Sequence, residues 1–95
     1  MSKDEDEGDD KSPIDKAIEE LESSAEIRFA RLLTICGTFF GEPRINGSHH
    51  IFRTPWQGDP RINLQEDKGG KAKRYQVRQV IRALRKLKET EDGDD

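Results

Sequence analysis

The chain has 95 residues, of which 39% are charged and 31% hydrophobic, so it holds one small domain and excludes a second core. The formal net charge is −3, but residues 1–10 hold six acidic side chains and one lysine, and residues 89–95 hold five acidic side chains and no basic one. Residues 44–88 hold twelve basic and three acidic side chains. This distribution predicts a basic domain at 12–88 between disordered acidic tails at 1–11 and 89–95, and it favours a polyanionic partner.

Two helices are predicted before residue 42. Ser12-Pro13 combines an N-cap with a proline at the first helical position, and apolar residues at 14, 17, 18 and 21 follow with helical spacing, so we predict a helix at 13–22. A second apolar pattern predicts a helix that ends at Gly41, before Pro43. Its apolar residues are Phe29, Leu32, Leu33, Cys36 and Phe40.

Three short strands are predicted next, at 42–45, 49–54 and 61–64, because turn residues punctuate this part of the chain. Asn46-Gly47 predicts the first hairpin turn, since both residues tolerate a positive φ. Residues 55–60, with a proline at each end, predict a longer and more rigid link between the second and third strands.

The clearest helix is predicted at 73–88, after a charged, glycine-containing loop at 66–70. It carries an apolar stripe and a basic stripe on neighbouring sides, so one side packs and the other is exposed. The apolar stripe is Val77, Val80, Ile81, Leu84 and Leu87, and the basic stripe is Arg74, Arg78, Arg82 and Arg85. The predicted class is α+β, in the order α-α-β-β-β-α, with helices on one face of a small antiparallel three-stranded sheet.

The segment from Gly47 to Phe52 contains both histidines of the chain at the start of a predicted strand. Neighbouring strand residues point to opposite faces, so either His49 or His50 faces solvent. Histidine exchanges protons near neutral pH, which makes this position a candidate for acid–base chemistry, with a non-catalytic hydrogen-bonded pair as the alternative. The same alternation argues against a Ser48–His49 nucleophile pair and favours a role for Ser48 in the turn.

The basic stripe of the last helix has no acidic residue near it between Lys68 and Lys88. Like charges four residues apart are destabilising unless something neutralises them, so this feature favours contact with a polyanion. A solvated helix face and neutralisation by the acidic tails are the alternatives. Trp56 and Tyr75 are candidates for stacking on bases, although Trp56 equally fits a cover for the edge of the sheet.

No metal, cofactor or membrane partner is expected. Cys36 is the single cysteine and lies in an apolar stretch, which is typical of a buried small hydrophobic residue, and the diverging histidines disfavour a zinc site. No apolar run reaches the length of a membrane span, and the N-terminus is acidic where a signal peptide is basic and then hydrophobic. We therefore expect a cytoplasmic protein.

The run Gly47-Ser48-His49-His50-Ile51-Phe52-Arg53, with a helix before it and a short strand and a helix after it, resembles the HicA-type mRNA interferase toxins of bacterial toxin–antitoxin systems. The resemblance covers about residues 29–87. It implies a fold similar to a double-stranded RNA-binding domain, with the helix at 13–22 as an addition. The family's catalytic histidine falls on His49. Many members carry another histidine just after the third strand, where residues 63–67 of this chain have none.

The resemblance implies a ribosome-independent mRNA endonuclease that cleaves RNA without a metal and is neutralised by a HicB-like antitoxin protein. His49 moves the proton, and water, Lys71 or another basic group completes the chemistry. Two alternatives remain: a non-catalytic RNA-binding module of the same fold, and a protein-interaction domain whose basic helix docks an acidic partner. In the toxin interpretation the RNA is held by Ser48, Arg53, Lys71, Lys73, Arg74 and Arg78.

Overall fold

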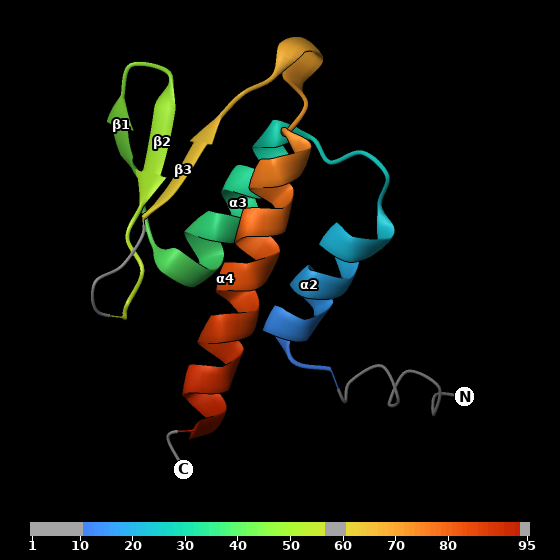
Figure 1. The fold of residues 1–95 in the computed structure, drawn as a ribbon, viewed down its shortest axis with the longest axis vertical. Coiled ribbons are helices and arrows are strands. Elements are labelled where there is room, and N and C mark those ends of the chain that lie inside the picture. Colours follow the sequence, from blue (N-terminus) through green and yellow to red (C-terminus); the bar gives the residue numbers. More distant parts are fainter. Residues whose placement is uncertain (1–10, 57–60, 94–95) are drawn as a thin grey trace.

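The computed structural model describes residues 11–56 and 61–93 of the chain. The protein has an α+β fold, and the predicted order of helices and strands is confirmed. The elements are α2 (Pro13–Ser23), α3 (Phe29–Phe40), β1 (Arg44–Asn46), β2 (His49–Phe52), β3 (Ile62–Gln65), the short 3-10 helix η1 (Lys68–Gly70) and α4 (Arg74–Gly93). The three helices lie on one side of the sheet (Figure 1). Similarity to a double-stranded RNA-binding domain stays a prediction.

Helix α2 begins as its sequence predicts. The Ser12 hydroxyl accepts a hydrogen bond from the Asp15 N–H at 3.2 Å, and Pro13 occupies the first helical position, where no N–H is needed. The apolar stripe is buried and packs mainly against α4, which makes α2 part of the core and not an appendage. Its buried members are Ile14, Ala17, Ile18 and Leu21.

Helix α3 supplies the centre of the core. Gly41 ends it with a φ of 89°, a conformation that favours glycine, and the Gly41 N–H donates to the Gly37 carbonyl at 3.1 Å. The structure buries Ile35, which the predicted stripe omits, and leaves Leu33 and Phe40 only partly buried. The reason is that α3 packs against both β2 and α4, so its buried face is set by two neighbours.

The sheet is antiparallel in the order β1-β2-β3. The predicted turn at Asn46-Gly47 is wrong by one residue: Asn46 pairs with His49, and Gly47 and Ser48 form the loop. Gly47 alone has a positive φ, of 63°, which fits a hairpin turn with glycine at its first central position. This shift leaves the faces of the strands unchanged, because moving the loop by one residue moves the pairing of β1 and β2 by two.

The two faces of the sheet differ in composition. Phe52, Ile62 and Leu64 point toward the helices and are fully or almost fully buried. His49, Ile51 and Asn63 alternate with them and form the outer face, on the side away from the helices (Figure 1). The outer face is the surface of the sheet that a ligand can reach.

Helix α4 extends to Gly93, five residues beyond its predicted end at Lys88, so residues 89–93 are helical and not part of a disordered tail. The Thr90 hydroxyl donates to the Lys86 carbonyl at 3.0 Å within this extension. A helix propagates at little cost once its packed part has formed, and this outweighs the unfavourable acidic residues at its C-terminal end. The predicted tail at 1–10 lies outside the described residues. No described helix combines the length and the apolar character that a membrane crossing requires.

Candidate nucleic-acid interface and histidine site

The two histidines point to opposite faces of the sheet, as the strand alternation predicts. His50 faces the helices, where its ring packs edge-on against Phe29 with centroids 5.4 Å apart, and its buried Nδ1 has no hydrogen-bond partner among the described residues. His49 lies on the outer face, where its Nδ1 is 2.9 Å from the Asn63 Oδ1. His49 is therefore the histidine that a ligand on the outer face meets.

The contact between His49 and Asn63 selects one form of the imidazole. An amide oxygen only accepts hydrogen bonds, so the His49 Nδ1 carries the proton and donates it. In the neutral ring the lone pair is then on Nε2, at the far side of the ring from Asn63. This is the arrangement of a general base whose orientation is set by a neighbouring residue.

The hairpin that carries His49 is tied to β3 and through it to α4. Gln65 donates from Nε2 to the Ser48 hydroxyl at 3.1 Å, and its backbone N–H donates to the Oε1 of Gln76 at 3.1 Å. Gln76 is a polar residue on α4 that is only 3% exposed, so it anchors the end of β3 to the core. Ser48 thus stabilises the turn, and its predicted contact with RNA stays a prediction.

Three exposed arginines surround this face of the sheet. Arg44 pairs with Ile51, and therefore shares the face of His49. Arg53 directly follows β2 and Arg61 directly precedes β3, and because Phe52 pairs with Ile62, both lie at the same end of the sheet. Within the described residues none of the three forms an ion pair. We call Arg44, Arg53 and Arg61 the sheet arginines.

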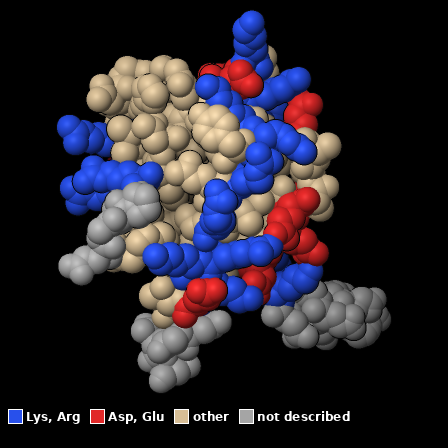
Figure 2. Space-filling view, in the orientation of Figure 1, with Lys and Arg blue, Asp and Glu red and all other residues tan. Residues whose placement is uncertain are grey.

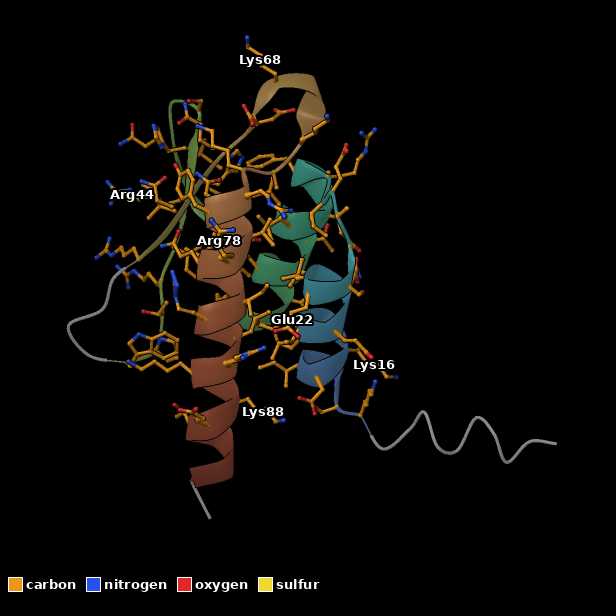
Figure 3. All side chains as sticks on the ribbon, turned by 45° about the vertical axis from the view of Figure 1, so that its right-hand side comes forward. Lys16, Glu22, Arg44, Lys68, Arg78 and Lys88 are labelled. Carbon is orange, nitrogen blue, oxygen red and sulfur yellow. The ribbon has the colours of Figure 1, made fainter. Side chains whose placement is uncertain are left out.

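Apart from Ser48 and Arg53, the residues predicted to hold RNA lie on the helical side of the molecule. Lys71 forms an ion pair of 3.6 Å with Glu26, and the Arg74 Nη1 donates to the Ala25 carbonyl at 3.1 Å, both beside the link between α2 and α3. Lys73 accepts hydrogen bonds at the start of α4 through its carbonyl, and Arg78 lies on the surface of α4 (Figure 3), where it lines a hollow between α2 and α4. Of the predicted residues, the structure thus brings only Ser48 and Arg53 to the sheet that carries His49.

The basic stripe of α4 is partly neutralised by α2. Arg85 pairs with Glu22, and Lys88 lies 2.7 Å from Asp15, where its hydrogen bond lowers the pKa of the Asp15 carboxyl. Figure 2 shows the basic side chains over α4 bordered by acidic ones toward α2. One predicted alternative was that the acidic tails neutralise the basic stripe of α4. Residues 1–10 and 94–95 lie outside the described residues. The neutralisation that is observed comes from helix α2.

Trp56, a candidate for stacking on bases, and Cys36, predicted to be buried, both take structural positions. Trp56 is half-buried, with its ring edge-on to Phe40 at 6.4 Å and the Lys86 ammonium 4.8 Å from its centroid, so it covers an edge of the core. Burial raises the pKa of the Cys36 thiol to about 12, which makes it inert as a nucleophile. Tyr75 is 58% exposed on α4. Within residues 11–56 and 61–93 no group of three or more potential metal ligands lies together.

Sequence reasoning missed three residues of the outer face: Arg44, Arg61 and Asn63. Strand alternation contained the signal for Arg44, because any two-residue hairpin loop near Gly47 places it on the face of His49. Asn63 and Arg61 needed the pairing of β2 with β3, which the link at 55–60 leaves undetermined in the sequence.

The chain was compared with known proteins at the level of family, sequence and structure. No protein-family model, no curated protein and no solved structure matches it. The resemblance to HicA-type toxins therefore stays a prediction, and the function is inferred from the residues of this chain.

Proposed function

We propose that the protein is an endoribonuclease that cleaves single-stranded RNA at the outer face of its sheet, with His49 as the general base. The observation that carries the proposal is the His49–Asn63 hydrogen bond of 2.9 Å on a face edged by the sheet arginines. It combines an oriented imidazole with positive charge that has no acidic partner among the described residues. The resemblance to HicA-type toxins suggests the same activity.

The chemistry uses the ribose of the substrate as the nucleophile. His49 Nε2 takes the proton of a 2′-hydroxyl, the 2′-oxygen forms a bond to the adjacent phosphorus, and the bond from phosphorus to the 5′-oxygen breaks. The leaving 5′-oxygen takes a proton from water, because Lys71 is engaged with Glu26 on the helical side. The products are a 2′,3′-cyclic phosphate and a 5′-hydroxyl, and DNA is not cleaved because it lacks the 2′-hydroxyl.

The sheet arginines supply the second requirement of the reaction, which is stabilisation of negative charge. Phosphoryl oxygens gain charge as the 2′-oxygen attacks, and guanidinium groups placed in advance stabilise that charge. Arg44 shares the face of His49, while Arg53 and Arg61 lie farther along the strands. We assign Arg44 to the phosphate at the cleaved bond. We assign Arg53 and Arg61 to the phosphates that follow it.

In the cell, such an activity requires control. By the same resemblance, we propose that the protein is the toxin of a toxin–antitoxin pair, acts on mRNA in the cytoplasm and is neutralised by a HicB-like antitoxin protein. No described helix covers the outer face of the sheet (Figure 1), so it is the surface that an inhibitor of the proposed reaction covers.

The test compares the two histidines of the chain. The purified protein is incubated with single-stranded RNA and with the same sequence as DNA, in EDTA. We expect cleavage of RNA only, and a loss of at least about 100-fold in His49→Ala with little change in RNA affinity. His50→Phe is the matched control: it removes the inward-facing ring but keeps its packing against Phe29, and activity is retained. Cleavage by His49→Ala at the wild-type rate would refute the proposal.

A non-catalytic RNA-binding module is the second candidate, and the unpaired sheet arginines favour it independently of His49. Such a module binds RNA in a salt-sensitive way but leaves it intact. The two candidates are separated by the products and by growth arrest on expression, which only the nuclease causes and which His49→Ala abolishes.

A further inference from the structure

A small hollow lies between the start of β3, the segment after β2 and the middle of α4. Its volume is about 190 Å³, which is below that of a pocket for a drug-sized molecule and suits a single ring system. Ile62 and Ala83 form apolar walls, Trp56 contributes its indole ring, and Gln79 contributes an amide. Arg82 and Lys86 extend from α4 at its rim.

The charges at this hollow distinguish it from two others on the described surface. The hollow of about 590 Å³ between α2 and α4 contains Glu22 together with its arginines, and a third one, of about 370 Å³, contains Asp15 and Glu89. Among the described residues that line the hollow at Trp56, two are cations and none is acidic. Arg82 has no ion pair or hydrogen bond within the described residues. The charges of the hollow at Trp56 therefore suit an anion.

The Lys86 ammonium lies over the Trp56 ring, 4.8 Å from the centroid. This contact occupies one face of the indole and shows that the face stabilises a cation; a nucleobase that stacks there takes the place of the ammonium. A nucleobase stacks on such a face regardless of its identity. The Gln79 amide offers both a donor and an acceptor, as the edge of a base requires.

We infer that this hollow binds one nucleobase of a single-stranded nucleic acid, which stacks on Trp56 while Arg82 and Lys86 hold its phosphate. The inference deepens the proposed function, because it gives the RNA a second anchor. Arg53 and Thr54 are adjacent in the chain, as are Arg61 and Ile62, so these two sheet arginines and the hollow lie at the same end of the sheet. An acidic peptide is the weaker fit, since a carboxylate uses neither the indole face nor the amide.

The test uses the only tryptophan of the chain as the reporter. Pentadeoxyadenylate is titrated into the full-length protein at low salt; it carries bases and phosphates but no 2′-hydroxyl and is not cleaved. We expect a saturable change in Trp56 emission, with inorganic phosphate causing none. The same change is expected in His49→Ala, so binding here is measured independently of cleavage.

Two double variants of α4 provide the matched comparison. Arg82→Ala/Lys86→Ala is expected to weaken binding of labelled pentadeoxyadenylate by at least about tenfold, and Trp56→Ala by about tenfold through loss of stacking. Arg85→Ala/Lys88→Ala removes the same charge from the same helix, but both cations are paired with α2, so a change below about twofold is expected.

Three results would overturn the inference. They are an unchanged Trp56 emission at saturating oligonucleotide, equal weakening by the two double variants, and displacement of the oligonucleotide by polyglutamate of equal charge. If RNA cleavage depends on His49 but Arg82→Ala/Lys86→Ala binds normally, the hollow is excluded and the nuclease stands. If Trp56 responds as expected but no RNA is cleaved, base binding in the hollow is supported and the nuclease is excluded.

Discussion

The outer face of the sheet and the exposed face of α4 both carry arginines, but only on α4 are several of the cations already engaged. Arg85 and Lys88 pair with Glu22 and Asp15 of α2, and Arg74 donates to the Ala25 carbonyl. The sheet arginines have no such partners within the described residues. Part of the longest basic pattern in the sequence is therefore already neutralised, whereas none of the sheet arginines is.

This difference shows how helix α2 changes the use of the charge pattern on α4 without changing the pattern itself. Helix α2 buries an apolar stripe against α4 and at the same time places two carboxylates beside its cations. Exposed ion pairs contribute little to stability, but they lower the positive potential that a polyanion meets. On α4, Arg78, Arg82 and Lys86 remain without an ion pair within the described residues, and on the sheet all three arginines do.

The largest expected effect on RNA affinity occurs when the sheet arginines are removed together. Arg44→Ala/Arg53→Ala/Arg61→Ala is expected to weaken binding by more than about tenfold at low salt and to reduce the slope of log K against log salt by about two, since each contact with single-stranded RNA contributes about 0.7. Fluorescence anisotropy at several salt concentrations measures both. The matched control is Lys16→Ala/Arg85→Ala/Lys88→Ala, which removes equal charge from the helical side (Figure 3). Equal slopes for the two triple variants would show that the sheet and the helical side contribute equally to RNA binding.

A smaller effect is expected when His49 loses its orienting partner. Asn63→Ala removes one hydrogen bond, worth about 1 kcal/mol, so we expect kcat for RNA cleavage to fall about fivefold while KM stays constant. Gln65→Ala is the control on the same strand, because the hydrogen bond of its side chain goes to Ser48 and not to His49. A fall in kcat of the same size in both variants would show that Asn63 acts only through the shape of the hairpin.

The smallest effect concerns the contact through which α2 neutralises α4. The hydrogen bond from Lys88 lowers the pKa of Asp15 below its ordinary value of 3.8, so this contact stabilises the fold above that pH and is lost as the pH falls through the lowered pKa. We expect Tm to decline less in Asp15→Asn than in the wild type between about pH 5 and pH 2. Thermal unfolding followed by circular dichroism measures this.

The control for Asp15 is Glu26→Gln, whose ion pair with Lys71 is long and exposed at 3.6 Å. Its acid profile is expected to follow the wild type. Parallel profiles for Asp15→Asn and the wild type would mean that the Asp15–Lys88 contact does not hold α2 in place.

Local signals in the sequence predicted the elements well. Ser12-Pro13 defines the start of α2 through atoms three residues apart, and Gly41 ends α3 because few other residues adopt its φ of 89°. The hairpin was misplaced by one residue, since Gly47 alone meets the conformational demand that the prediction assigned to Asn46 as well. These features depend on a few consecutive residues, so the sequence by itself determined them.

The site depends on distant residues, and only the tertiary structure decided it. Alternation requires that either His49 or His50 faces outward, but which one does depends on the side where α3 and α4 pack. The partner of His49 is 14 residues away across a strand pairing, and the carboxylate that engages Arg85 comes from another helix. Such contacts follow from the burial of apolar stripes against each other, and the packing of the core then determines which polar side chains meet.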